Sequence, residues 1–330
     1  MRARTVAWAV IGVLLAAAFL YAALRGVDLA QLGHTIASAN PWLVTGCCVL
    51  NTVNLAFRAA RWRILLNAEG DVPYGTAFWA TAAGYFGNNF LPARAGELVR
   101  TFLITAASGL DTAYVLATAL AERVVDAIVL VLIASLALMV FPAESGFLSG
   151  AARPFAIAGL IGAFVLVVLP RTGGWPHRVL ARLPMPPALR RFADTAVDGA
   201  IRGLRTFHGG AALSRFLALT AIIWTLDAFI AIAAAAAIGV DLAWHVSLLL
   251  LASLGLASAL PSSPGYVGIY QFVAVTVLEP FGYRRADAIA LVVVMQATSY
   301  AVNALWGAIG VVRYRRRVRE TANAGGSIGR

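Results

Sequence analysis

Six apolar stretches of this chain are each long enough to cross the hydrocarbon core of a membrane, which is about 30 Å thick and needs about 20 helical residues. They cover residues 5–25, 42–66, 113–141, 154–170, 213–238 and 286–313. Hydrophobic residues make up 61% of the 330 residues and charged residues 12%, whereas soluble globular chains are about 45–50% apolar and about 25% charged. The sequence therefore predicts an all-α, polytopic transmembrane bundle and excludes a soluble enzyme.

Two further apolar segments, 75–107 and 244–282, are interrupted near their middle by proline and glycine. The first interruption runs from Asn88 to Glu97 and the second from Leu260 to Gly268. Proline removes a backbone donor and glycine permits a positive φ, so the chain should turn at both places. Non-helical backbone survives at membrane depth only inside protein or beside a wet cavity. We therefore interpret both segments as re-entrant hairpins whose tips meet near the midplane.

The distribution of arginine supports this topology. The net charge is +11, and arginines gather before the first helix, at the end of the second (Arg58, Arg61 and Arg63), in segment 171–212 and in the tail from Arg313. If both hairpins return to the side from which they entered, all four clusters face the cytoplasm, as the positive-inside rule requires. The sequence thus predicts a multi-pass protein of the cell inner (cytoplasmic) membrane with cytoplasmic N- and C-termini. Positive charge beside apolar spans indicates anionic lipid as the partner and not nucleic acid.

The predicted helices divide a single membrane domain, residues 1–330, into two similar halves. Residues 42–141 form a helix, a hairpin and a helix starting from the outside, and residues 213–313 repeat this order starting from the inside. Such an inverted-topology repeat is typical of transporters with a central site, although a Leu-Pro turn in each hairpin is common enough to arise by coincidence. The other parts are the first helix and outer loop (1–41), a linking helix with a cytoplasmic amphipathic segment (142–212), and a cytoplasmic basic tail (314–330).

Ionisable side chains at bilayer depth are the main functional signal, because each costs about 2.5–3.5 kcal/mol at a helix centre and should pair or line water. Six lie in or after the first hairpin turn and in the following helix: Arg94, Glu97, Arg100, Glu122, Arg123 and Asp126. Two interpretations are open. These arginines and carboxylates could neutralise one another and fix the hairpin to the next helix. Alternatively, one or two guanidinium groups face a cavity and hold a lipid phosphate by bidentate hydrogen bonds, assisted by a helix N-terminus.

The second half offers mainly uncharged polar groups. Around its hairpin these are Ser262, Ser263, Gln271 and the backbone amides near Gly265 and Gly268. Asp227 lies in the middle of the span 213–238, where it is either the counter-charge of an arginine, which we favour, or a proton-coupling site. Polar side chains along the second and last helices fit helix–helix contacts at least as well as substrate contacts. They are Asn51, Asn54, Arg58, Gln296, Ser299 and Asn303.

The sequence contains no recognisable catalytic or metal-binding pattern. It has no Walker loop, dinucleotide fingerprint, HExxH motif or GxSxG motif. Its four histidines are too scattered for a metal site, and Cys47 and Cys48 lack metal-ligand spacing. We therefore predict no cofactor, no metal and no catalytic residue, and a transporter-like protein in preference to an enzyme.

Three runs of sequence resemble the membrane domain of lysylphosphatidylglycerol synthase/flippase proteins: NFLPARAGELVR from Asn89, ERVVD from Glu122 and LPSSPGYVG from Leu260. The resemblance covers nearly the whole chain and implies that aminoacylated phospholipids, polyprenyl-linked sugars or hopanoid lipids are moved or presented. The resemblance implies a functional role for the six ionisable positions given above. Asn89, the first residue of the first run, is a further candidate site residue. Two departures matter. No C-terminal aminoacyl-transfer domain is recognised, so lysine transfer is not expected, and Gln271 stands where the family commonly has glutamate.

Three functions remain in competition. The leading hypothesis is a lipid flippase or translocator that binds the phosphate of a phospholipid or polyprenyl-linked headgroup in a midplane cavity. The second is an intramembrane enzyme acting on a lipid phosphate, with Glu122 or Asp126 as the general base. The third is a scaffold that holds glycosyltransferase or lipid-modifying partners through the basic amphipathic helix from Leu189 to His208.

Overall fold

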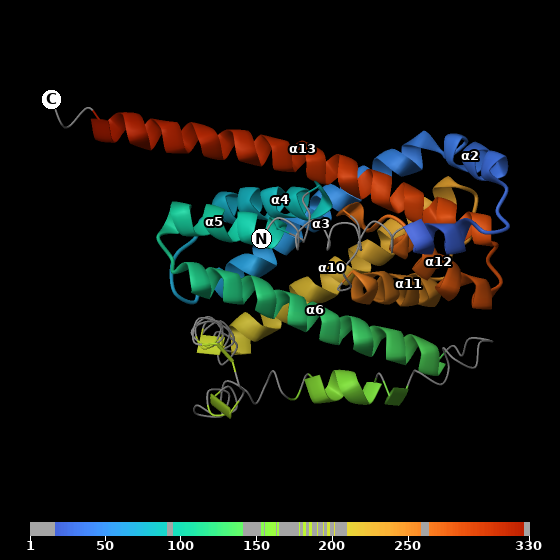
Figure 1. Ribbon diagram of the computed structural model, residues 1–330, viewed down its shortest axis with the longest axis horizontal. Helices are drawn as coiled ribbons and strands as arrows, with labels where there is room; N and C mark the ends of the chain where they lie inside the picture. Colours follow the sequence, from blue (N-terminus) through green and yellow to red (C-terminus); the bar gives the residue numbers. More distant parts are fainter. Residues whose placement is uncertain are drawn as a thin grey trace.

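The computed structural model of the chain describes residues 17–90, 95–140, 210–258 and 264–326, together with scattered positions between 153 and 201. All regular structure in these residues is helical (Figure 1). The elements are α2 (Leu29–Ala37), α3 (Pro41–Leu66), α4 (Tyr74–Phe90), α5 (Gly96–Ser108), α6 (Thr112–Val140), α10 (Gly210–Ala237), α11 (Trp244–Ala257), η4 (Pro264–Tyr266), α12 (Ile269–Leu278), η5 (Glu279–Phe281) and α13 (Arg285–Gly326).

The prediction of an all-α transmembrane bundle is confirmed. Within the described residues, four helices are long and apolar enough to cross a membrane: Pro41–Leu66, Thr112–Val140, Gly210–Ala237 and Arg285–Tyr314. Each lies within three residues of its predicted bounds. The predicted helix 5–25 and the amphipathic segment fall largely outside the described residues. About half of the predicted helix 154–170 is described, and those residues are helical.

The start of α3 illustrates how local sequence sets these bounds. Pro41 occupies the first turn, where its missing N–H is not needed. The side chain of Asn40 accepts hydrogen bonds from the amides of the two residues that follow Pro41, at 3.0 and 3.4 Å. These bonds satisfy two of the free amides that every helix start exposes, so the helix begins where the sequence predicts.

The first interrupted segment forms two helices, α4 and α5, that pack against each other. Their contact is closest at Gly96, where a Cβ atom would overlap the backbone carbonyl of Gly84 and lie 2.5 Å from the amide nitrogen of Asn88. Only glycine allows two backbones to approach so closely. The chain therefore doubles back after Phe90 as predicted, while re-entry of this hairpin into a membrane stays a prediction.

The second interrupted segment forms α11 and α12, which also pack against each other. The backbone between them has positive φ angles at Gly265 (72°), Tyr266 (58°) and Gly268 (90°). Two of these positions are glycines of the predicted Pro-Gly turn. That this segment is re-entrant also stays a prediction.

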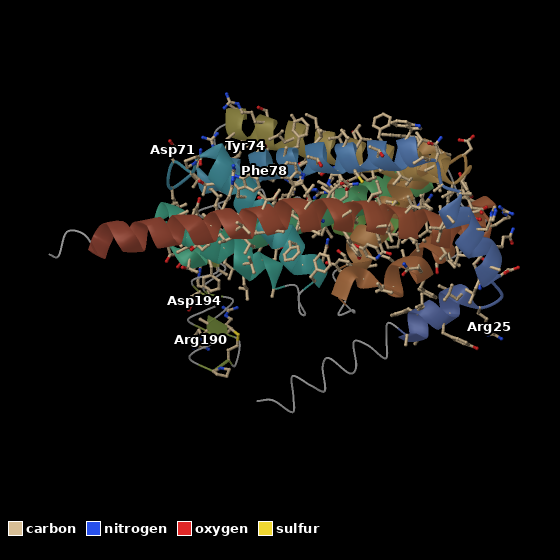
Figure 2. The ribbon with its side chains drawn as sticks, turned by 90° about the horizontal axis from the view of Figure 1, so that it is seen from above. Arg25, Asp71, Tyr74, Phe78, Arg190 and Asp194 are labelled. Carbon is tan, nitrogen blue, oxygen red and sulfur yellow. The ribbon has the colours of Figure 1, made fainter. Side chains whose placement is uncertain are left out.

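The two pairs of short helices lie at opposite ends of the molecule (Figure 1). Figure 2 shows Asp71 and Tyr74, where α4 begins, at the end opposite to Arg25. The start of α13 lies at the Arg25 end, because Arg285 donates a hydrogen bond to the carbonyl of Arg25 at 3.0 Å. Each pair of short helices therefore enters the bundle from its own end.

Corresponding helices of the two halves also have corresponding neighbours. Helix α4 packs on α13 and α11 packs on α6, while α3 and α10 pack against each other between them. Within each half, α5 contacts α6 just as α12 contacts α13. An internal repeat would produce this pattern, but the inverted repeat itself and the domain boundaries stay predictions.

Candidate functional site

A cavity of about 690 Å³ lies between the two halves of the bundle. Its lining residues come from α3, α4, α5 and α6 on one side and from α10, α11, η4, α12 and α13 on the other. Both pairs of short helices contribute residues near their turns, among them Asn89 and Tyr266. The charged residues of its wall are Arg58, Glu97, Arg123, Asp126 and Asp227.

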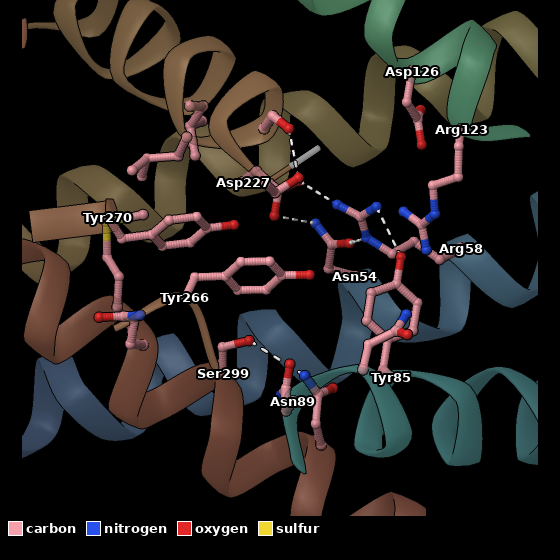
Figure 3. Close-up of a pocket in the computed structure, with 18 of the residues that line it drawn as sticks. Asn54, Arg58, Tyr85, Asn89, Arg123, Asp126, Asp227, Tyr266, Tyr270 and Ser299 are labelled. Carbon is pink, nitrogen blue, oxygen red and sulfur yellow. Dashed lines mark hydrogen bonds and ion pairs between the residues drawn. The ribbon is translucent and has the colours of Figure 1, made fainter. Parts of the chain in front are cut away.

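Arg58 of α3 forms an ion pair with Asp227 of α10, with 2.6 Å between Nη2 and Oδ2 (Figure 3). Its Nε donates to Oδ1 of Asn54 at 2.7 Å, and its Nη1 donates to the hydroxyl of Tyr85 at 3.1 Å. Asn54 also donates from Nδ2 to Asp227 at 3.0 Å. These bonds hold a cation at the cavity wall and join the two halves across α3 and α10.

Arg123 of α6 has the most exposed arginine side chain of the described ionic network, with 34% of it accessible. Its Nε and Nη2 both lie 3.0 Å from the same oxygen of Glu97. No described residue accepts a hydrogen bond from its Nη1, and the ring centroid of Tyr85 lies 5.5 Å from the guanidinium carbon. Arg123 therefore keeps a free donor although one carboxylate balances its charge.

Two further arginines lie behind the wall and do not line the cavity. Arg61 of α3 donates to both oxygens of Asp126 at 2.6 and 2.9 Å, and to Oε1 of Glu122 at 2.9 and 3.1 Å. Arg100 of α5 donates to Glu97 at 2.6 Å and to the other oxygen of Glu122 at 3.0 Å. Both arginine side chains are almost fully buried, so their contribution is to hold α3, α5 and α6 together.

The described network is balanced in charge. Its members are Arg58, Arg61, Arg100 and Arg123 with Glu97, Glu122, Asp126 and Asp227. A buried charge without a partner is strongly destabilising, and the balance explains how this many ions persist in an apolar bundle. Glu97 is the branch point, because it bonds Arg100 and Arg123 and accepts a hydrogen bond from Asn88 at 3.2 Å.

The wall formed by η4, α12 and α13 carries no charge in its described residues. Tyr266 and Tyr270 stack with ring centroids 4.8 Å apart and planes 10° from parallel. Figure 3 shows their hydroxyls directed toward Asn54. Tyr266 has the left-handed φ of 58°, which is uncommon for a residue other than glycine and typical of strained functional positions.

Gln271 does not line the cavity but holds the turn beside it. Its Oε1 accepts a hydrogen bond from the amide of Gly268 at 2.7 Å, and its Nε2 donates to Gln296 at 2.6 Å. Gln296 in turn donates to the carbonyl of Gly265 at 2.8 Å. An ionised carboxylate cannot donate a hydrogen bond, so the amide at position 271 suits this chain of contacts and fixes the backbone that carries Tyr266.

Three polar atoms of cavity-lining residues have no hydrogen-bond partner among the described residues. They are Oδ1 of Asn88, Nδ2 of Asn89 and Nε1 of Trp224. A buried polar group without a partner costs about 1–3 kcal/mol. Each of the three atoms is almost fully buried, so it lies just beneath the surface of the cavity wall.

The predicted site residues fall into three groups. Those that line the cavity are Asn89, Glu97, Arg123, Asp126 and Asp227. Those that do not line it are Arg100, Glu122, Gly265, Gly268 and Gln271. Arg94, Ser262 and Ser263 lie outside the described residues. Asp227 is the counter-charge of Arg58, which is the interpretation favoured above. Substrate binding by any of these residues stays a prediction.

The cavity wall also contains residues that were not among the predicted site residues: Asn54, Arg58, Tyr85, Trp224, Tyr266 and Tyr270.

The interpretation of Arg58 and Arg61 as charges at a cytoplasmic helix end is wrong, because both arginines form ion pairs inside the bundle. The available signal was the spacing of Asn54 and Arg58, which puts two polar groups on one face of an apolar helix. The tyrosines carried no comparable signal.

Comparison with known proteins places the chain among membrane proteins. It matches the sequence profile described as lysylphosphatidylglycerol synthase TM region over residues 9–307. It is 24% identical over 315 residues to the protein named Glycosyltransferase AglD of Haloferax volcanii, covering 85% of this chain and 50% of that protein. It is also 24% identical over 311 residues to a UPF0104 membrane protein of Methanothermobacter thermautotrophicus, covering 86% and 87% of the two chains. The chain thus spans about half the length of AglD and most of the second relative.

Proposed function

The chain belongs to the lysylphosphatidylglycerol synthase transmembrane-region family, and we propose that it moves a lipid between the leaflets of a membrane by binding the lipid phosphate in the central cavity. It is a multi-pass membrane protein. We further propose that the protein lies in the cell inner membrane with both termini in the cytoplasm. Its partners are then anionic phospholipid or a polyprenyl phosphate-linked lipid.

The observation that carries the proposal is the accessibility of the Arg123 side chain together with its incomplete set of hydrogen bonds. It lines the cavity, a third of its side chain is accessible, and one carboxylate oxygen is its only described ionic partner. A guanidinium offers five N–H donors in a plane that matches two phosphate oxygens. Phosphate binding by Arg123 therefore needs no ion pair to break, and Arg58, on the same cavity wall, adds a second positive charge.

The arrangement of the short helices supports movement as well as binding. The two pairs enter from opposite ends and both reach the cavity. We expect displacement of either pair of helices to open the cavity toward its own end, while the other pair keeps the opposite end closed. Alternating access around a fixed central site is the mechanism that paired interrupted segments commonly serve.

We expect the substitution Arg123→Gln to slow leaflet exchange by roughly 10- to 100-fold, because one charge-assisted hydrogen bond contributes about 1.5–3 kcal/mol. The full chain is reconstituted in unilamellar vesicles with phosphatidylglycerol or polyprenyl phosphate that carries a fluorophore on its tail. Added dithionite bleaches the outer leaflet, and the slow loss of the remaining fluorescence reports exchange.

The matched control is Arg284→Gln, because Arg284 also pairs with a carboxylate but lies at the surface with 70% of its side chain exposed. It should exchange lipid at the wild-type rate. Equal rates for Arg123→Gln and the wild type, or no exchange of either lipid by the wild type, would contradict the proposal.

The two alternative functions have less support. As a general base, Glu122 would need a free carboxylate, yet Arg61 and Arg100 engage both of its oxygens away from the cavity. Asp126 lines the cavity but is bonded through both oxygens to Arg61. The scaffold hypothesis rests on the helix from Leu189 to His208, which lies largely outside the described residues; the name of the relative AglD agrees with a glycosyltransferase partner.

A further inference from the structure

Tyr85 of α4 lies against both arginines of the cavity wall (Figure 3). The centroid of its ring is 5.7 Å from the guanidinium carbon of Arg58 and 5.5 Å from that of Arg123. The arginines come from α3 and α6, so side chains of three helices meet at this part of the wall. The attraction between an aromatic ring and a cation accounts for the position of the ring. It does not account for the hydroxyl.

The hydroxyl of Tyr85 serves only as an acceptor within the part of the chain that the structure describes. It accepts a hydrogen bond from Nη1 of Arg58 at 3.1 Å, and no described residue accepts its hydrogen. A tyrosine hydroxyl can donate one hydrogen bond while it accepts another. Because linked hydrogen bonds polarise one another, the bond from a cation also makes this O–H a better donor. Tyr85 thus offers an unused donor in the cavity wall.

A second unused donor lies beside it on Arg123. Nε and Nη2 of Arg123 share one oxygen of Glu97, whereas its Nη1 has no acceptor among the described residues. A phosphodiester carries its charge on two oxygens, and both of them only accept hydrogen bonds. The two unused donors therefore match the two charged oxygens of one phosphate.

An uncharged donor suits this wall better than another arginine would. The described network already balances four arginines with four carboxylates. A further buried guanidinium would need a further carboxylate, and that carboxylate would repel a phosphate. A hydroxyl donates to an anion and leaves no charge to balance when the anion has gone. It therefore strengthens the site without disturbing the empty cavity.

We propose that Tyr85 binds the lipid phosphate directly, its hydroxyl donating to one charged oxygen while Nη1 of Arg123 donates to the other. Arg58 then has two effects on the phosphate. It adds positive charge to the wall, and its bond to the hydroxyl oxygen holds the O–H of Tyr85 in place. The inference rests on the proposed phosphate site and adds a binding residue to it.

Two matched substitutions test the hydroxyl. Tyr85→Phe removes it and keeps the ring. Tyr74→Phe makes the same change in the same helix, where the hydroxyl donates to the carbonyl of Ala56 at 3.1 Å and does not line the cavity. The methyl phosphodiester of geranylgeraniol is titrated into the full chain in maltoside detergent, and its dissociation constant is measured by native mass spectrometry. We expect Tyr85→Phe to weaken binding by about tenfold or more, since the lost hydrogen bond is to a charged group, and Tyr74→Phe to keep the wild-type affinity.

A sulfur substitution in the ligand distinguishes direct contact from a structural role. Replacing one charged oxygen of the diester with sulfur gives two stereoisomers, which are separated and titrated in the same way. Sulfur is a weak hydrogen-bond acceptor, so each isomer should bind the wild type more weakly than the parent diester. Tyr85→Phe should abolish this loss for one isomer only, and Arg123→Gln should abolish it for the other isomer only.

Wild-type affinity of Tyr85→Phe for the parent diester would overturn the proposal. A Tyr85→Phe variant that binds the diester weakly but still loses affinity with both sulfur isomers would also overturn it, because the hydroxyl would then position Arg58 without touching the phosphate. Failure of the phosphate site itself has a different signature: Arg123→Gln would leave the affinity for the parent diester unchanged.

Discussion

Replacing Arg61 with methionine should destabilise the folded bundle by about 3–5 kcal/mol, which is the usual result of removing one partner from a buried ion pair. Arg61 supplies every described hydrogen bond that Asp126 receives and two of those received by Glu122. Only 1% of the Arg61 side chain is accessible, so water cannot take its place. Asp126 would be left as a buried charge without a described ionic partner.

The measurement is the thermal unfolding midpoint of the purified chain in detergent, together with the fraction that elutes as a single monodisperse species. The double variant with Arg61→Met and Asp126→Asn removes both charges and should recover at least half of the lost stability. Arg284→Ala, at an exposed ion pair, should change stability by less than about 1 kcal/mol. A folded Arg61→Met variant with the wild-type midpoint would show that this arginine is not needed in the buried network.

The substitution Gly96→Ala should separate α4 from α5, with a loss of stability of about 1–3 kcal/mol or more, as overpacking usually causes. The added methyl would overlap the carbonyl of Gly84 and approach Asn88. These are backbone atoms, which cannot turn away as a flexible side chain can. Because Arg100 and Glu97 follow in the same helix, their ion pairs would also move.

Gly75→Ala is the matched control, since Gly75 lies in α4 with open space around it. Gly75 is in the first turn of α4, and an added methyl meets no neighbour there. This variant should therefore unfold at the wild-type midpoint. Protection of the α5 amides in hydrogen exchange should fall in Gly96→Ala and stay unchanged in Gly75→Ala. Equal midpoints and equal protection for both variants would exclude a tight contact between α4 and α5.

The fold was largely predictable because its signals are local. Apolar runs of helical length predict the four long helices, and the Pro-Gly turns predict where the two short pairs break. The three motif runs also led to the family, and that resemblance is confirmed. The inverted repeat and the re-entry of the hairpins depend on a membrane boundary, and they stay predictions.

The ionic network was predictable only where its partners are close in sequence. The spacing of three residues between Glu97 and Arg100 predicts their pair, which forms at 2.6 Å. Arg61 and Glu122 are far apart in the chain, and no local pattern indicates that α3 supplies an arginine to α6. An arginine near a helix end has the same sequence appearance whether it faces water or a buried carboxylate.

The uncharged side of the cavity could not be predicted for a related reason. Tyr266 and Tyr270 stack on each other, and Tyr266 does so with a left-handed φ that no local pattern predicts. Gln271 was expected among the substrate contacts, yet its amide supports that turn and does not line the cavity. Its role depends on Gln296, which lies on a different helix.

The central claim is that a lipid phosphate binds in the cavity between the two halves. We would test it with a cryo-electron microscopy map of the full chain in nanodiscs that contain polyprenyl phosphate. We expect density for the phosphate beside Nη1 of Arg123, on the cavity side of Arg58, continuous with a tail that leaves between helices. Lipid density confined to the outer surface, with the cavity closed by side chains, would contradict it.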